Sequence, residues 1–173
     1  MLCLCEDFLA LPRTDKADCL LVDALLPGLS GVDLLGLLQA ENSQVPAVVL
    51  TGFGDAAMAV AAMKAGASDL IEKPTSAAEL IASVRYAIRT AQNGPARTDS
   101  RKAANLRFAK LTTRERQVLQ HVLAGEPNKI IAADLGINQR TVENHRASVM
   151  RKTGAGSLPA LVRMALAADV QDA

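Results

Sequence analysis

The sequence has 173 residues and a formal net charge of +1, and half of its residues are hydrophobic while 2% are aromatic. This composition excludes a wholly disordered chain, and no stretch approaches the roughly 20 consecutive apolar residues of a membrane-spanning helix. The three cysteines show neither a Cys-x-x-Cys spacing nor histidine partners, so we expect reduced thiols in a cytoplasmic protein rather than disulfides or a zinc site.

The near-neutral total conceals two halves of opposite charge. Residues 1–95 hold 6 Lys and Arg against 11 Asp and Glu, whereas residues 96–173 hold 13 against 7. Such asymmetry indicates nucleic acid as the partner of the basic half. A Gly-Pro pair among small polar residues separates the halves and indicates a linker. We therefore predict one domain at 1–92, a linker at 93–109 and a second domain at 110–173.

Short apolar runs alternate with helical patterns in the acidic half. The runs predict strands at 19–23, 47–51 and 69–72, and the helical patterns cover 31–41, 55–65 and 76–92. Apolar runs that are buried on both faces and alternate with helices are typical of a parallel sheet with right-handed crossovers. The acidic half is therefore expected to have an α/β fold.

Three chemically active side chains stand at or directly after the ends of these strands, namely Asp23, Thr51 and Lys73. The carboxyl ends of parallel strands meet at one edge of the sheet, where ligands of such folds bind. A carboxylate can accept a phosphoryl group as an aspartyl-phosphate, and a hydroxyl and an ammonium can bind its oxygens. This arrangement favours a phosphoryl site, although each residue taken alone could be a cap, a strand end or a surface lysine.

The segments around these residues resemble the receiver domains of two-component systems. The resemblance lies in Asp23–Gly31, in Thr51-Gly-Phe-Gly and in the stretch 65–74, which ends in Lys73-Pro74. It implies a flavodoxin-like fold in which Asp23 is the phosphoacceptor for a sensor histidine kinase. It also implies that Thr51 and Lys73 sense the phosphoryl group and that the Lys73–Pro74 peptide bond is cis.

The start of the chain departs from the receiver pattern. Only 22 residues precede Asp23, whereas a single βαβ unit takes about 30 or more. The segment Glu6–Pro12 resembles the second helix of the family, so we expect an N-terminally truncated receiver without the acidic pair that holds Mg²⁺. Asp23 alone would be a weak Mg²⁺ site, and phosphorylation is expected to be weak. Less favoured is an arrangement in which Glu6 and Asp7 are the metal ligands.

Two further consequences follow from these departures. Leu70 occupies the position where the family often has an aromatic switch residue, so signalling through that residue is not expected. The missing strand would be central in the sheet, and its absence would leave the strand at 19–23 with an unpaired edge. Such edges pair with other chains, so a homodimer formed by strand-edge pairing or domain exchange is expected.

The basic half has an all-helical pattern from Leu111 onward. Thr112 and Glu115 have the spacing of a capping box at the start of a first helix, and a short helix follows at 128–135. Gly136 begins a turn before a third helix at 139–152, and a fourth helix begins near Ser157. Two helices joined by a glycine-containing turn are typical of a helix-turn-helix, whose second helix enters the major groove of DNA.

The third of these helices is expected to read DNA. At about 100° per residue, Val142 and Val149 share a buried face, and the polar side chains opposite suit base edges. Residues nearer the buried face, together with lysines, are expected to contact the DNA backbone. The predicted DNA-contacting residues are Lys129, Arg140, Thr141, Glu143, Asn144, His145, Arg146, Ala147, Arg151 and Lys152. The alternative is a solvated amphipathic helix that binds no ligand.

Segments at 111–119, 128–135 and 141–150 resemble the LuxR-type DNA-binding module, and the whole chain resembles FixJ/NarL-type response regulators. The resemblance implies a truncated flavodoxin-like receiver followed by an all-α four-helix helix-turn-helix domain. It also implies a transcriptional regulator, not an enzyme, with double-stranded DNA, a sensor kinase and RNA polymerase as partners. Two other functions stay open, namely a protein-interaction module that never binds DNA and a phosphohydrolase that uses Asp23 as its nucleophile.

Overall fold

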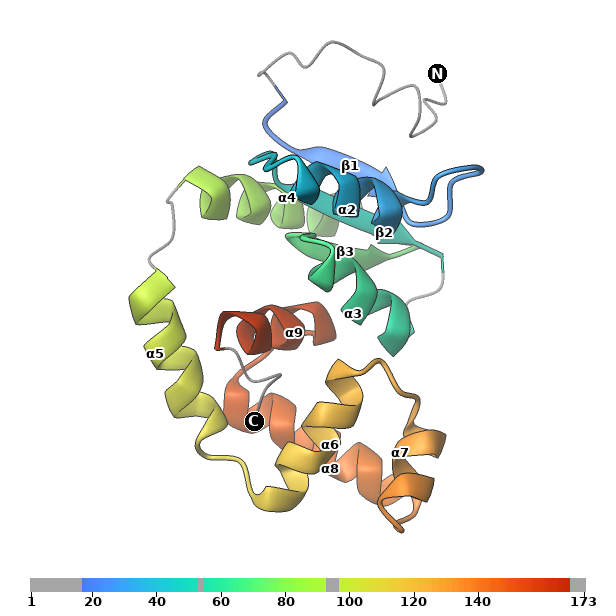
Figure 1. Cartoon of the computed structure of the whole chain (residues 1–173), viewed down its shortest axis with the longest axis vertical. Coiled ribbons are helices and arrows are strands. Elements are labelled where there is room, and N and C mark those ends of the chain that lie inside the picture. Colours follow the sequence, from blue (N-terminus) through green and yellow to red (C-terminus); the bar gives the residue numbers. More distant parts are fainter. Residues whose placement is uncertain (1–16, 53–54, 93–96, 169–173) are drawn as a thin grey trace. The chain divides into compact units, whose positions relative to one another are not determined.

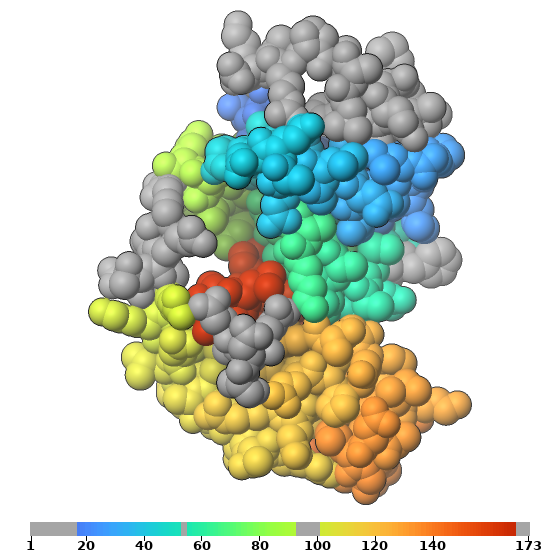
Figure 2. Space-filling model, viewed as in Figure 1, coloured from blue at the N-terminus to red at the C-terminus, as the bar shows by residue number. Residues whose placement is uncertain are grey.

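The computed structural model describes residues 17–52, 55–92 and 97–168 (Figure 1). The chain divides into two units, one that takes in residues up to 54 and 61–94, and one that takes in residues 55–60 and 95 onward. We call them the sheet unit, which holds the strands, and the helical unit, which follows it. In the space-filling view the sheet unit is drawn mainly in blue to green and the helical unit in yellow to red (Figure 2). None of the described helices combines the length and the apolar character that crossing a bilayer requires.

The sheet unit contains three parallel strands in the order β1-β2-β3 among its described residues. They are β1 (Leu20–Asp23), β2 (Ala47–Thr51) and β3 (Asp69–Glu72). Val49, in the middle of β2, is paired with Val22 of β1 and Leu70 of β3. The strands predicted from the apolar runs and their parallel pairing are therefore confirmed.

Helices follow each strand, as the alternating pattern predicts. They are α2 (Gly31–Ala40), α3 (Ala56–Lys64) and α4 (Ala77–Gln92). Ser30 caps α2 by accepting a hydrogen bond from the Asp33 amide, and Ser76 does the same for Glu79 at the start of α4 at 3.1 Å. Helix α4 covers the sheet through a buried cluster formed by Val48, Ile71 and Ala87.

The helical unit contains α5 (Arg97–Phe108), α6 (Thr113–Leu123), α7 (Asn128–Asp134), α8 (Gln139–Thr153) and α9 (Leu158–Ala167). Helix α5 lies within the segment 93–109 that is predicted to be the linker, and no helix was predicted there. The helix forms because Ala104 and Phe108, one turn apart, are both buried, and α5 packs against α8 and α9. The described part of this unit therefore has a fifth helix ahead of the four that were predicted.

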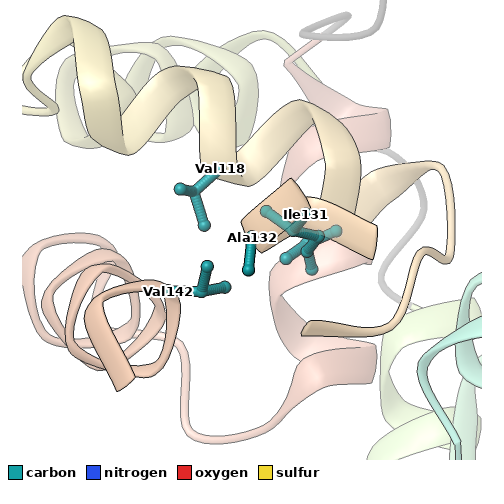
Figure 3. Close-up of a cluster of buried hydrophobic side chains, with 5 residues drawn as sticks. Val118, Ile131, Ala132 and Val142 are labelled. Atoms are coloured by element: carbon teal, nitrogen blue, oxygen red, sulfur yellow. The ribbon is translucent and has the colours of Figure 1, made fainter. Parts of the chain in front are cut away.

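A small aliphatic core fixes the helix-turn-helix (Figure 3). Val118 of α6, Ile131 and Ala132 of α7 and Val142 of α8 converge on one cluster, which also includes Val122. Asn138 caps the start of α8, and Gly154 ends α8 in the left-handed conformation at φ +72°. Helices α5, α6 and α7 all pack against α8, and the side of α8 that they leave uncovered is open to solvent or a ligand.

Candidate nucleic-acid interface and phosphoacceptor site

Helix α8 has a buried face and an exposed face. Val142 and Val149 are almost fully buried, as their spacing predicts. The exposed side chains of α8 include five of the predicted DNA-contacting residues, namely Arg140, Glu143, Asn144, Ala147 and Arg151. Lys129, at the start of α7, is exposed as well, and Figure 2 shows this part of the helical unit in orange at the surface. This face therefore combines cationic, amide, carboxylate and methyl groups in one stripe.

The predicted residue Arg146 points toward α7. It is half-buried, and its Nη1 donates a hydrogen bond to Oδ1 of Asn128, the first residue of α7, at 2.7 Å. Burial lowers the pKa of the Arg146 guanidinium, although an arginine stays charged in proteins. Arg146 therefore links α8 to the start of α7.

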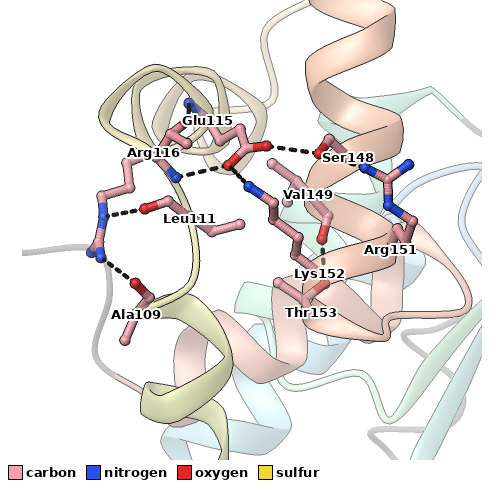
Figure 4. A network of polar contacts seen from close by, with 10 residues as sticks. Ala109, Leu111, Glu115, Arg116, Ser148, Val149, Arg151, Lys152 and Thr153 are labelled. Carbon is pink, nitrogen blue, oxygen red and sulfur yellow. Dashed lines mark hydrogen bonds and ion pairs between the residues drawn. The ribbon is translucent and has the colours of Figure 1, made fainter.

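Lys152 takes part in a polar network centred on Glu115 (Figure 4). The Lys152 ammonium lies 2.6 Å from Oε2 of Glu115, which also accepts a hydrogen bond from the Thr112 amide at 2.7 Å. The Ser148 hydroxyl donates to Oε1 of Glu115 at 2.7 Å. Burial alone would raise the pKa of Glu115, but the hydrogen bonds from Lys152, Thr112 and Ser148 lower it to about 2. The sequence predicts the capping box of Thr112 and Glu115, whereas the network that joins α6 to α8 was missed.

Thr141 and His145 are the two remaining predicted residues of α8. The amide and the hydroxyl of Thr141 both donate to Oδ1 of Asn138, at 2.8 and 2.9 Å, so Thr141 completes the N-cap. His145 is half-buried. Sequence reasoning also missed Arg114, whose guanidinium donates to the carbonyl of Leu135 in the turn between α7 and α8. No local pattern could reveal this contact, because the two residues are 21 positions apart.

The three predicted phosphoryl-site residues lie at the carboxyl ends of the strands. Asp23 ends β1, Thr51 ends β2 and Lys73 follows β3. The Lys73 ammonium forms an ion pair with Oδ2 of Asp23. The Lys73 amide donates to the Thr51 carbonyl at 2.7 Å, and the Lys73–Pro74 bond is cis. The structure thus brings Asp23 and Lys73 into contact and places the buried Thr51 beside Lys73 along the backbone.

The electrostatics of Asp23 favour its ionised form. The hydrogen bond from Lys73 lowers the pKa of Asp23 most, partial burial opposes this shift, and the Leu25 amide supports it by donating to Oδ1 at 3.1 Å. Gly31 permits the start of α2 to lie against the backbone of Asp23, because a Cβ at position 31 would lie 2.2 Å from the Asp23 carbonyl oxygen. Asp23 is therefore a charged, accessible carboxylate on a closely packed turn.

Among the described residues, one group of three His, Cys, Asp or Glu side chains converges closely enough to hold a metal ion, and it consists of His121, Glu126 and Asp134 in the helical unit. Asp23 belongs to no such group in the described ranges, and Glu6 and Asp7 lie outside those ranges. Mg²⁺ is usually bound by one or two carboxylates together with several waters and phosphate oxygens, and at these strand ends the Asp23 carboxylate is already paired with Lys73.

Comparison with known proteins finds two families. The profile of the response regulator receiver domain matches residues 4–85, and that of the luxR family of bacterial regulatory proteins matches residues 109–165. The transcriptional regulatory protein FixJ of Azorhizobium caulinodans is 49% identical over 156 residues, which cover 90% of this chain and 74% of that protein. FixJ of Rhizobium meliloti is 48% identical over 162 residues, which cover 94% of this chain and 79% of that protein. A solved structure of full-length FixJ from B. japonicum is 44% identical, covers 87% of this chain and 74% of that chain, and has a TM-score of 0.40.

Proposed function

Because this chain belongs to the FixJ/NarL-type two-component response regulators, we propose that the exposed face of α8 selects the operator sequence in DNA. The chain combines a receiver domain with a LuxR-type DNA-binding domain, and its FixJ relatives are transcriptional regulators, not enzymes. The phosphohydrolase alternative is therefore abandoned.

The observation that carries the proposal is the division of α8 into two faces. The buried face holds Val142 and Val149, and the opposite face presents side chains that match base edges. Arg140 and Asn144 suit purines, Glu143 suits the amino group of cytosine, and Ala147 suits a thymine methyl. Arg151 extends the same stripe. A solvated amphipathic helix would also expose polar side chains, so the DNA titrations below separate the two interpretations.

The remaining predicted residues support this face in two ways. Lys129 and His145 contact phosphates, which set the register of the protein on the duplex. Thr141, Arg146 and Lys152 act through the protein itself, because their polar atoms are engaged with Asn138, Asn128 and Glu115. Loss of one of the latter three side chains should disturb the angle of α8 rather than remove a single DNA contact.

The experiment begins by enriching, from random sequence, a DNA duplex that the full chain binds. Titrations of this duplex are then monitored by fluorescence anisotropy. Arg140→Ala should weaken binding to the enriched duplex by about 1–3 kcal/mol and relax base preference at one position. Lys129→Ala should weaken binding to all duplexes alike and reduce the slope of affinity against salt by about one ion.

Lys64→Ala is the matched control, because Lys64 is an exposed lysine in α3 of the sheet unit. This variant removes the same charge and should change neither the affinity nor the salt slope. Unchanged binding in both Arg140→Ala and Lys129→Ala would reject the interface. Absence of any salt-dependent DNA binding would favour the protein-interaction alternative.

Phosphorylation is a second part of the proposal. Receiver domains generally bind Mg²⁺ when they are phosphorylated, and sensor kinases phosphorylate response regulators. We propose that the present chain is phosphorylated weakly at Asp23 and that its DNA binding depends little on this modification. Two observations support this proposal. The Asp23 carboxylate is paired with Lys73, and among the described residues Asp23 belongs to no group of three possible metal ligands. Thr51 and Lys73 are proposed to contact the phosphoryl oxygens when the modification does occur.

Intact-mass measurement after incubation with a small phosphodonor and Mg²⁺ tests this part. The chain should show little modification, and Asp23→Asn should remove what there is. A second receiver domain, known to accept phosphate from the same donor, treated in parallel shows that the donor is active. Extensive Mg²⁺-dependent modification that is lost in Asp23→Asn would contradict weak phosphorylation and leave the DNA interface untouched.

The partners follow from the same assignment. We propose that the chain binds DNA as a homodimer that forms along β1, because β1 pairs only with β2 in the described sheet and Leu21 of β1 is half exposed. Such an edge offers unpaired backbone groups to a second copy. Sedimentation should show a concentration-dependent dimer that Leu21→Lys weakens, and a monomer at all concentrations would reject the proposed dimer.

A sensor kinase and RNA polymerase are the further partners expected for a transcriptional regulator.

A further inference from the structure

We propose that His121, Glu126 and Asp134 form a binding site for a divalent transition-metal cation of the Zn²⁺ class in the helical unit. His121 lies in the last turn of α6, Glu126 in the turn after it, and Asp134 is the last residue of α7. One donor atom from each side chain lies within 4.8 Å of the other two. The site lies outside the face of α8 and outside the strand ends, so it is independent of the proposed function.

The backbone at the end of α6 fixes two of the three donors. Gly125 adopts a left-handed conformation at φ +81°, its amide donates to the Val122 carbonyl at 3.0 Å, and the Glu126 amide donates to the His121 carbonyl at 3.1 Å. This pair of bonds is a Schellman motif, in which the two residues joined by the longer loop often make a hydrophobic contact. Here an imidazole and a carboxylate occupy these positions, with Nδ1 of His121 2.6 Å from Oε2 of Glu126.

Asp134 is the third donor of the group. Its carboxylate is placed at the C-terminus of α7, where the helix dipole disfavours negative charge. Although exposed, it faces His121 and Glu126, and it makes no hydrogen bond or ion pair with any residue in the described part of the chain. Two carboxylates beside one imidazole leave an excess of negative charge even when the imidazole is protonated. A divalent cation would balance this charge with the imidazole neutral.

The donor set selects the class of cation. One imidazole nitrogen with two carboxylate oxygens is a three-ligand set that Zn²⁺ accepts together with a water, whereas Mg²⁺ prefers oxygen alone. Ligand atoms about 2.0–2.2 Å from a tetrahedral Zn²⁺ lie about 3.3–3.6 Å apart. A pair of donor atoms separated by 4.8 Å therefore has about 1.5 Å to close, which a rotation of the exposed Asp134 can supply. The bound cation would tie the end of α6 to the end of α7.

Histidine NMR provides a specific test, because the chain has only two histidines. In the full chain, Zn²⁺ should shift the ring-nitrogen signals of His121 and leave those of His145 unchanged, and Mg²⁺ should shift neither. A readout on the histidine rings also separates this site from zinc bound by the cysteine thiols. In Asp134→Asn, the Zn²⁺ concentration that produces half of the His121 shift should rise at least about tenfold, since even changes to residues that only support a metal ligand weaken metal affinity by that much.

Two variants complete the experiment. Asp134→Asn alters an exposed side chain and removes a charge that the helix dipole disfavours, so its melting temperature without metal should be no lower than that of the parent chain. His145→Gln removes the other imidazole and should retain the shift of His121. The proposal is overturned if Zn²⁺ does not move the His121 signals, if Asp134→Asn responds as the parent does, or if Mg²⁺ produces the same shift.

Discussion

Lys152 and Glu115 form an ion pair in the helical unit, and Lys73 and Asp23 form one in the sheet unit. The charged groups are the same, but the surroundings differ. The Glu115 side chain is 6% exposed and accepts hydrogen bonds from three residues, whereas the side chains of Asp23 and Lys73 are 32% and 42% exposed. The buried pair can hold two helices together. The exposed pair leaves its carboxylate accessible to a reactant and its lysine free to move.

Removing the lysine of the buried pair should give the largest effect. Lys152→Met leaves the carboxylate of Glu115 buried without a counterion, which costs about 3–5 kcal/mol of unfolding free energy. The measurement is urea denaturation followed through amide NMR signals of α6 and α8, so that the helical unit is observed separately from the sheet unit.

The controls for this variant test the cause. The double variant Glu115→Gln with Lys152→Met removes both charges and should recover a large part of the loss. Lys64→Met changes an exposed lysine and should stay within about 0.5 kcal/mol of the parent. A loss below about 1 kcal/mol in Lys152→Met would show that the buried pair behaves like a surface pair.

Acid should weaken the helical unit through the same carboxylate. The pKa of Glu115 is about 2 in the folded chain against an ordinary value of 4.5. Because the pKa is lower in the folded chain, the ionised Glu115 stabilises the fold fully above pH 4.5. This stabilisation is lost as the pH falls from 4.5 to 2. The difference corresponds to about 3 kcal/mol. Unfolding free energies of the parent and Glu115→Gln across this interval should converge toward the acid end, and parallel curves would contradict the assignment.

Sequence patterns anticipate these features unequally. The strand ends that carry Asp23, Thr51 and Lys73 could be predicted, because short buried runs define parallel strands and parallel strands meet at one edge. The buried face of α8 follows from the spacing of Val142 and Val149. Both inferences depend only on backbone periodicity, which a single sequence displays directly.

Side-chain partners across the fold could not be predicted in this way. Lys152 and Glu115 are 37 positions apart and Arg146 and Asn128 are 18 apart, so only the packing of the helices brings them together. Helix α5 was missed for a related reason. Its buried residues are just Ala104 and Phe108 in the part whose side chains are described, which is too few for a periodic pattern, and their burial depends on α8 and α9.

Arg146 gives an intermediate case between the two pairs, because it is half-buried and bonds to a neutral partner. Arg146→Met removes the hydrogen bond to Asn128 at 2.7 Å and should cost about 2 kcal/mol, as for other hydrogen bonds to charged groups. A double-mutant cycle with Asn128→Ala should show a coupling of at least about 0.5 kcal/mol. Strictly additive losses would mean that Arg146 stabilises α8 without Asn128.

The exposed pair should give the smallest effect on stability and a distinct effect on ionisation. Lys73→Met should cost less than about 1 kcal/mol, since solvent screens the pair. The same change removes the main cause that lowers the pKa of Asp23, so this pKa should rise toward its ordinary value of 3.8. Carboxyl NMR titration measures the rise, and Lys64→Met should leave the pKa of Asp23 unchanged. A loss of stability as large as that of Lys152→Met would contradict the contrast between the two pairs. It would mean that Lys73 mainly supports the fold, and a lysine in that role has little freedom to leave Asp23 and contact a phosphoryl group.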